Sequence, residues 1–219
     1  MNKNINLTAE DGHEFTAYLA EPENPKAGLV IIQEIFGITE HLKSVAREFA
    51  ELGYKTIVPS LFDRLEPGIV LDYANVEKGV ELMGKSKQQD MLIDIKSAME
   101  AVKVDGKIAV LGYCMGGTLA YVSANELSPT CAVSYYGTAI TDHLSKQPSC
   151  PMLFHFGEVD PYVCQQDIEL IRAANPQQPI YVYAEANHGF SCVDRASYHQ
   201  KSAELAFTRT VDFLSKNLA

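Results

Sequence analysis

The chain has 219 residues and, with 18 basic and 28 acidic side chains, a formal net charge of −10 at neutral pH. Hydrophobic residues make up 47% of the sequence and charged residues 21%, which is typical of a folded globular protein and excludes a disordered one. The acidic balance, without any lysine and arginine cluster, argues against nucleic acid as a partner, because binding phosphates needs a concentrated basic surface. At about 150 residues per domain, the length predicts a single domain over residues 1–219.

The sequence predicts a cytoplasmic protein that does not interact with membranes. The first residues, MNKNINLTAEDGHEF, lack the apolar core of a signal peptide, and no apolar run approaches the ~18 residues needed to cross a bilayer. An odd number of cysteines without a CxxC pair fits neither a disulfide framework nor a zinc site, and a reducing compartment is the simplest setting for them. These cysteines are Cys114, Cys131, Cys150, Cys164 and Cys192.

Taken in chain order, short apolar runs alternate with amphipathic stretches. Residues 13–19 alternate between apolar and polar side chains, which predicts an antiparallel edge strand. The later runs are continuously apolar, which predicts strands covered on both faces in a mostly parallel sheet. They are Gly28–Gln33, Lys55–Val58, Lys107–Leu111, Cys131–Tyr136, Pro151–Phe156 and Ile180–Ala184.

Between these runs, apolar residues recur three or four positions apart, which is the spacing of one face of an α-helix. The stripes are Leu42, Val45, Phe49 and Leu52; Leu92, Ile95, Met99 and Val102; and Phe207, Val211, Leu214 and Leu218. The alternation of strands and helices predicts a three-layer α/β fold, with a mostly parallel central sheet and helices on both faces. For residues 59–89 we expect irregular structure and a helix that lies over the site.

The most informative segment is Gly112-Tyr113-Cys114-Met115-Gly116, which follows a predicted buried strand and directly precedes a helix. It has the form of the G-x-S-x-G nucleophile elbow with cysteine in place of serine. Small residues two positions before and after the nucleophile let strand and helix approach each other. The helix N-terminus favours the thiolate of Cys114, and the Met115 amide is positioned to donate to an oxyanion. The alternative is a buried structural cysteine in a glycine-rich turn.

Two polar residues downstream complete a possible triad, in the order nucleophile, acid, histidine. Asp160 and His188 each follow a predicted parallel strand, at the sheet edge where ligands bind in open α/β folds. Asp160 would orient His188, which would handle the proton of the nucleophile. Glu158 competes with Asp160 for the acid role, and Asp160 is favoured because it begins a D-P loop. His155 lies inside an apolar strand and is expected in the core.

Together these residues resemble the dienelactone hydrolase (carboxymethylenebutenolidase) family of the α/β-hydrolase fold. This family has no separate lid domain, which suits the length of the chain. The matching segments are QEIFGI (33–38), GYKTIVPSLF (53–62), GYCMGG (112–117), SYYG (134–137), GEVDPYV (157–163) and NHGF (187–190).

The resemblance implies roles for several residues besides Cys114, Asp160 and His188. Glu34 matches a glutamate that holds the resting thiol and shifts when substrate binds. Ile35 and Met115 match the two backbone donors of the oxyanion hole, and Phe36 and Tyr135 match residues that line the substrate pocket. On physical grounds, a carboxylate held beside a thiol opposes ionisation and so protects the sulfur from oxidation.

One departure from the family concerns the arginines that bind the carboxylate of a dienelactone. Cys192 stands where the arginine after the histidine would fall, and residues 71–89 contain no arginine. Arg64 and Arg195 are the remaining candidates for binding a substrate anion, with surface ion pairs as the alternative for each. Recognition of a carboxylated lactone is therefore in doubt, whereas the catalytic residues are retained.

The sequence thus predicts a cysteine-dependent hydrolase that acts on small esters or lactones through an acyl-thioester, with no metal or organic cofactor. Its expected partner is a small-molecule ester or lactone. We expect a monomer, because no strand has the pattern of an exposed sticky edge. The alternative is a non-catalytic binding protein or redox sensor on the same fold, which Cys114 would serve through a sulfenic acid.

Overall fold

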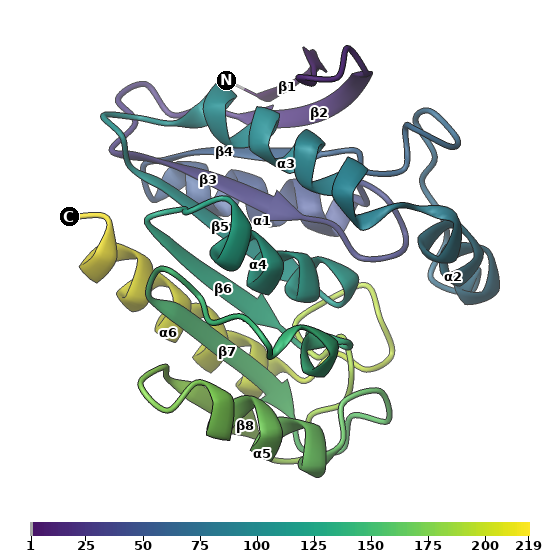
Figure 1. Ribbon diagram of the computed structural model, residues 1–219, viewed down its shortest axis with the longest axis vertical. Coiled ribbons are helices and arrows are strands. Elements are labelled where there is room, and N and C mark those ends of the chain that lie inside the picture. Colours follow the sequence, from purple (N-terminus) through teal and green to yellow (C-terminus); the bar gives the residue numbers. More distant parts are fainter. Residues whose placement is uncertain (1) are drawn as a thin grey trace. The chain divides into compact units, whose positions relative to one another are not determined.

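The computed structural model describes residues 2–219, which contain eight β-strands and six α-helices (Figure 1). The chain divides into two compact units, one ending at Val110 and the other beginning at Leu111. Within the described residues, no helix combines the length and the apolar character that crossing a membrane requires. The assignment of residues 1–219 to a single domain stays a prediction.

The first unit contains four strands that pair in the order β1-β2-β4-β3. Their bounds are Asn2–Thr8 (β1), Glu14–Ala20 (β2), Ala27–Ile32 (β3) and Tyr54–Pro59 (β4). β3 and β4 are parallel, whereas β2 runs antiparallel to both β1 and β4. The predicted antiparallel strand is therefore confirmed as β2. It is not at the edge, because the largely exposed β1 covers its outer side.

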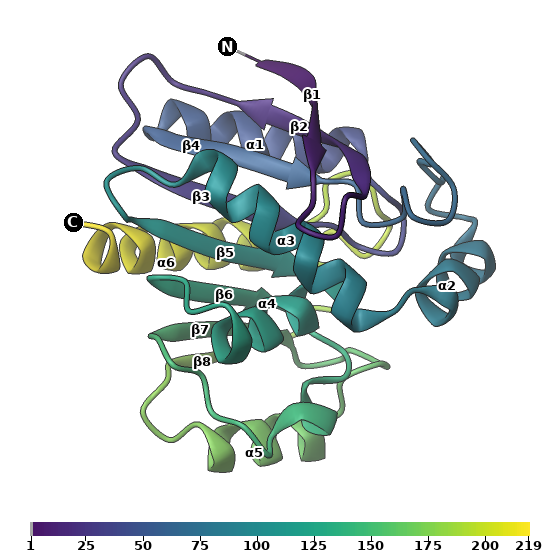
Figure 2. The same cartoon turned by 45° about the horizontal axis from the view of Figure 1, so that its top comes forward.

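Helices cover the parallel strands of this unit. The helices are α1 (Glu40–Glu51), α2 (Val76–Lys85) and α3 (Gln88–Val102), and Figure 1 shows α1 and α3 on opposite faces of β3 and β4. Leu42, Val45 and Phe49 of α1 are buried as the stripe predicted. Leu52 is the C-cap and is 39% exposed. In contrast, α2 stands apart from the strands (Figure 2).

One carboxylate organises the chain that follows β4. Asp63 accepts hydrogen bonds from the backbone amide of Thr16 (2.7 Å) and the Thr16 hydroxyl (2.8 Å) in β2. It also accepts bonds from the Ser60 hydroxyl (2.6 Å) and the backbone amide of Gly68 (2.8 Å). The start of the irregular segment that the sequence predicts after β4 is thus hydrogen-bonded to β2.

The second unit places helices around parallel strands in the same way. β5 (Ile108–Tyr113) crosses the boundary and leads into α4 (Met115–Glu126). β6 (Cys131–Tyr135), β7 (Met152–Gly157) and β8 (Ile180–Tyr183) pair in parallel. Figure 1 shows α4 and α6 (Gln200–Asn217) on opposite faces of β6. α5 (Gln165–Ala174), which the sequence analysis did not anticipate, packs its buried Ile168 and Ile171 into an apolar cluster with Phe154 and Phe156.

Candidate active site

Cys114 occupies the sharp turn that joins β5 to α4. Its backbone has φ of 55° and ψ of −120°, a conformation that residues with a side chain rarely adopt. A Cβ at Gly112 would overlap the carbonyl group of Gly116, and a Cβ at Gly117 would lie 2.7 Å from the carbonyl oxygen of Tyr135. Glycine is therefore required at these positions for the turn to close as tightly as it does.

Backbone hydrogen bonds fix Cys114 at the N-terminus of α4. Cys114 is the N-cap of α4, and its carbonyl accepts a hydrogen bond from the amide of Gly117 (2.9 Å). Its own amide donates to the carbonyl of Tyr135 in β6 (3.0 Å), which fixes the turn to the neighbouring strand. The residue therefore lies at the N-terminus of a 12-residue helix, the positive end of the helix dipole.

The chain brings Asp160 and His188 together through two loops at the ends of β7 and β8. The amide of Glu158 donates to the carbonyl of Tyr183 (2.9 Å), and the amide of Val159 donates to that of Ala186 (3.0 Å). These bonds join the two loops just before the polar residues, at the carboxyl ends of neighbouring parallel strands.

The carboxylate of Asp160 bonds to the imidazole of His188. The distance from Asp160 Oδ2 to His188 Nδ1 is 2.8 Å, and both side chains are buried. Asp160 Oδ1 accepts a hydrogen bond from the backbone amide of Tyr162 (2.8 Å). Glu158, the alternative acid, is exposed and accepts a bond from the backbone of Glu185 (3.2 Å). The acid beside the histidine is therefore Asp160.

His188 is strongly biased towards its protonated form. Burial disfavours the imidazolium, but hydrogen bonds to Asp160 and to the Cys114 side chain, with the charges of both, raise the pKa of His188 to about 10. At neutral pH, the imidazole then carries a proton that it can deliver to a leaving group. The same contacts place Cys114, His188 and Asp160 in one hydrogen-bonded chain.

Two tyrosines flank the imidazole edge to face, and the sequence analysis assigned a role to neither. The distance between ring centroids is 4.9 Å for Tyr136 and His188 and 5.0 Å for Tyr162 and His188. Tyr136 is fully buried, and its hydroxyl is bonded to Ser191 (2.8 Å). Tyr162 is 60% exposed, so its ring is accessible from solvent beside the histidine.

Tyr135, which the family resemblance puts in the substrate pocket, is buried, and its place in that pocket stays a prediction. Its hydroxyl is bonded to Thr210 in α6 (2.7 Å), and its ring lies 4.5 Å from the imidazole of His155. His155 is bonded to both Tyr183 (2.7 Å) and Thr210 (3.0 Å), so it is a core histidine as expected. The second tyrosine of the SYYG segment is the one that contacts His188.

The residues expected to meet the substrate from the first unit follow β3 directly. Glu34 is 1% exposed, and its backbone carbonyl accepts a bond from the Gln33 side chain (3.2 Å). Ile35 and Phe36 are also buried. The ring of Phe36 meets that of Tyr73 edge to face at 4.9 Å. A loop carrying a buried carboxylate is thus held by contacts within its own unit.

Arg64, expected to bind a substrate anion, is committed to other carboxylates. Its Nε and Nη2 form a bidentate pair with Asp94 (2.9 and 2.7 Å), and its Nη1 bonds to Asp11 (2.7 Å). The planar guanidinium matches one carboxylate with two donors, and these ion pairs are the alternative that the sequence left open for Arg64. The Arg195 side chain lies against Gly189, since a Cβ there would be 2.6 Å from the guanidinium carbon.

Two other thiols illustrate what burial without a charged partner does. Burial raises the pKa of Cys131 to about 12 and that of Cys150 to about 11, so both remain neutral thiols at physiological pH. Cys164, at the N-cap of α5, is exposed.

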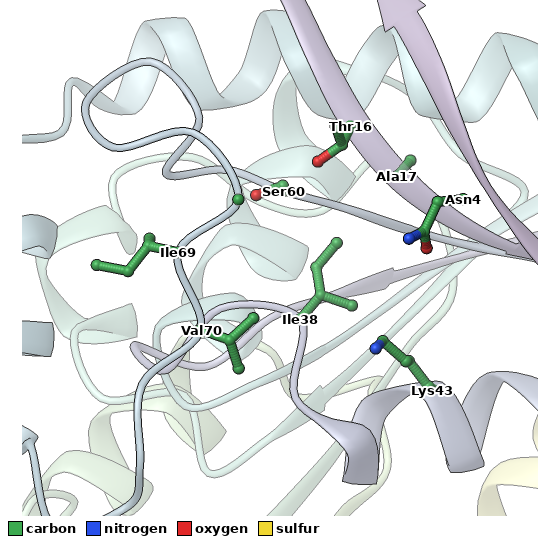
Figure 3. Close-up of a pocket in the computed structure, with 9 residues that line it drawn as sticks. Asn4, Thr16, Ala17, Ile38, Lys43, Ser60, Ile69 and Val70 are labelled. Atoms are coloured by element: carbon green, nitrogen blue, oxygen red, sulfur yellow. The ribbon is translucent and has the colours of Figure 1, made fainter.

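A cavity of about 200 Å³ opens in the first unit beside the loop that carries Ile38 (Figure 3). Ile38 from that loop projects between Val70 and Ala17 in this view. The Ser60 hydroxyl at its wall donates to Asp63, and Lys43 is 3.4 Å from Glu40, so these polar groups already have partners. The cavity therefore presents a largely apolar lining.

Comparison with known proteins gives three consistent findings. The model of the dienelactone hydrolase family matches residues 15–218. A carboxymethylenebutenolidase of Pseudomonas putida is 31% identical over 98% of this chain and 97% of its own, and a putative carboxymethylenebutenolidase of Yersinia pestis is 32% identical over 94% and 85%. The crystal structure of a putative dienelactone hydrolase from Klebsiella pneumoniae has a TM-score of 0.85 and 27% identity, covering 98% of this chain and 99% of its own.

Proposed function

The chain belongs to the dienelactone hydrolase family, with its α/β-hydrolase fold, and is a hydrolase of ester or lactone bonds; from this premise we propose that Cys114, His188 and Asp160 are its catalytic triad. The observation that carries the proposal is the hydrogen-bonded chain from the Cys114 side chain through His188 to Asp160. The substrates are small esters or lactones, and the reaction passes through an acyl-thioester on Cys114.

In the first half of the reaction, the Cys114 thiolate attacks the carbonyl carbon and the carbonyl oxygen takes up the negative charge. Backbone amides of Met115 and Ile35 donate to this oxyanion, as the family resemblance implies. When the tetrahedral intermediate collapses, the bond to the alcohol oxygen breaks and the alcohol takes the proton from the His188 imidazolium. The thioester and neutral His188 remain.

In the second half, His188 removes a proton from water, which attacks the thioester carbonyl. Collapse releases the carboxylic acid and restores the thiolate beside the imidazolium. Asp160 holds the ring of His188 in one tautomer and stabilises the charge that forms on it.

Two further assignments complete the proposed site. Glu34 holds the resting thiol and moves when substrate binds, a role supported by its burial at the end of β3, where an unbonded carboxylate would be costly. Phe36 and Tyr135 line the substrate pocket, as the family resemblance implies. Tyr136 joins them in this role because it packs against His188.

The proposal is tested by comparing Cys114→Ala with Cys164→Ala. Both cysteines are helix N-caps, but only Cys114 is in contact with His188. We expect Cys114→Ala to lose hydrolysis of activated aryl esters and Cys164→Ala to keep it. In quenched samples of the wild type, mass spectrometry should find the acyl group on the peptide that contains Cys114. Equal rates in wild type and Cys114→Ala would refute the nucleophile. Sulfenic acid at Cys114 without turnover of any ester would favour the redox-sensing alternative.

A further inference from the structure

Helix α2 buries only two of its described residues against the first unit, and its Lys78 also pairs with Glu66 outside the helix. Along Val76–Lys85, the buried residues are Gly79 and Leu82, and Val76 and Val80 are 37% and 48% exposed. Figure 2 shows the helix standing away from the strands. Such a helix is held by few apolar contacts, so whatever it touches at Gly79 carries much of its attachment.

At Gly79, the helix backbone presses directly against Ile35. A Cβ added to Gly79 would lie 2.7 Å from the carbonyl oxygen of Ile35, 3.0 Å from its Cγ1 and 3.1 Å from its Cβ. Carbon atoms in proteins do not approach a carbonyl oxygen this closely, and the oxygen belongs to backbone that has no rotamer with which to move aside. Gly79 therefore sets how near α2 comes to Ile35.

The residues that follow Ile35 are held by the chain that leads into α2. The amide of Leu71 donates to the carbonyl of Phe36 (2.9 Å), and Gly37 forms an antiparallel bridge with Val70. The Tyr73 hydroxyl donates to Thr39 (3.2 Å). Backbone pairing thus fixes the loop after Ile35, and α2 supports Ile35 itself.

We propose that Gly79 is a positioning residue that lets α2 hold the Ile35 backbone where its amide serves the oxyanion. This inference rests on the proposed function, in which the amide of Ile35 is one of two oxyanion donors. Such a donor works within a narrow range of about 2.7–3.1 Å from the oxyanion, so a small displacement weakens the transition state more than the bound substrate.

The experiment uses two glycines of the same helix. Gly84 is also inside α2, but a Cβ there would have nothing within 4 Å. Gly79→Ala and Gly84→Ala therefore make the same chemical change, with the same gain in helix propensity, and differ only in the contact with Ile35. Purified full-length variants are compared in aryl ester hydrolysis, thermal melting and inhibition by a trifluoromethyl ketone, whose adduct with the thiolate carries the same oxyanion.

We expect Gly79→Ala to lower kcat about tenfold with KM changed less than about twofold, since complete loss of an oxyanion donor costs about 10²–10³-fold. The affinity for the trifluoromethyl ketone should fall by the same factor as kcat/KM. A loss of folded protein alone would lower the active fraction without moving this affinity. Gly84→Ala should match wild type in ester hydrolysis and in ketone affinity, and should melt slightly above it because of the gain in helix propensity.

Equal kcat in Gly79→Ala and Gly84→Ala would overturn the inference and leave the proposed function intact. A wild-type protein without Cys114-dependent turnover would instead contradict the proposed function. If Gly79→Ala does not fold, Leu82→Ala loosens the second anchor of α2 without adding an atom near Ile35. It should show the same parallel loss of kcat and ketone affinity, and unchanged values would again overturn the inference.

Discussion

Two buried histidines of the second unit lie in closely similar surroundings and titrate in opposite directions. His188 and His155 both follow or occupy parallel strands, both have hydrogen-bonding partners, and both pack against tyrosine rings. Yet the pKa of His188 is raised to about 10, whereas burial and the nearby charge of Arg209 lower the pKa of His155 to about 3.

The difference lies in the partners rather than in the degree of burial. His155 bonds to the hydroxyls of Tyr183 and Thr210, which carry no charge and do not compensate the loss of water around an imidazolium. His188 bonds to a carboxylate, which does. Burial alone makes a histidine a neutral structural group, whereas the Asp160 carboxylate and the Cys114 sulfur together turn His188 into an acid suited to catalysis.

The largest expected effect comes from removing that carboxylate. Asp160→Asn keeps the shape of the side chain but removes the charge that holds the imidazolium, so the pKa of His188 should fall. We expect kcat to drop by about 10⁴-fold, as when the acid of a hydrolase triad is replaced by its amide. Steady-state ester hydrolysis gives kcat, and the titration of the His188 ring protons by NMR gives the pKa.

Glu158→Gln is the matched control for this change, because Glu158 is in the same loop and its carboxylate bonds only to the backbone amide of Glu185. It should leave kcat within about twofold of wild type, the size of effect expected for an exposed side chain. A larger loss in Glu158→Gln than in Asp160→Asn would assign the acid role to Glu158.

A smaller effect, on stability, is expected from His155. Because its folded pKa of about 3 lies below the ordinary 6.5, the unfolded chain binds a proton between these values and the native protein does not. Stability is therefore lost as pH falls from 6.5 towards 3, by about 1.4 kcal/mol per pH unit. His155→Gln keeps two hydrogen-bonding atoms and removes this titration.

Urea unfolding at pH 6.5 and pH 4.5 measures the contribution of His155. Wild type should lose about 2 kcal/mol more than His155→Gln between these two conditions, because the unfolded histidine is already half protonated at pH 6.5. Equal losses in both proteins would mean that His155 is protonated in the native state, and the contrast with His188 would disappear.

The smallest expected effect concerns Tyr162, the exposed ring beside His188. An edge-to-face pair contributes about 0.5–1.5 kcal/mol, so Tyr162→Ala should lower kcat/KM about three- to tenfold. Tyr162→Phe retains the ring and should stay within about twofold. The pH profile of kcat/KM should shift in Tyr162→Ala only. Identical profiles in the two variants would show that the ring does not act on the imidazole.

The strands and the elbow could be predicted because their signals are local. Apolar runs mark β3 to β8, and the glycines around Cys114 are dictated by the approach of β5 to α4. β1 was not predicted because its side chains are mostly exposed and show no apolar pattern. It forms a strand because its backbone pairs with β2. α5 escaped because only Ile168 and Ile171 are buried along it.

Side-chain direction was the part that sequence could not supply. In the SYYG segment, Tyr135 and Tyr136 are equally good candidates for lining a pocket. The positive φ of Tyr136 (40°) shows where the strand ends, and the ring of Tyr136 packs against His188. Arg64 likewise has no local mark of its partners, since Asp94 is 30 residues away and Asp11 is 53 residues away in the chain. Long-range partners decide which polar groups are left for a substrate.

Asp63 does for the first unit what a cross-link would do, without a covalent bond. It unites β2, the residue after β4 and the backbone of Gly68. Although burial acts in the other direction, the bonds from Ser60, Gly68 and Thr16 keep the pKa of Asp63 below its usual value. The stabilisation from these hydrogen bonds is thus complete above the ordinary aspartate pKa and is lost as the pH falls through the lowered pKa of Asp63. In mild acid, Asp63 therefore keeps its hydrogen bonds to Thr16, Ser60 and Gly68. In strong acid, protonation of this one carboxylate weakens the attachment of all three segments.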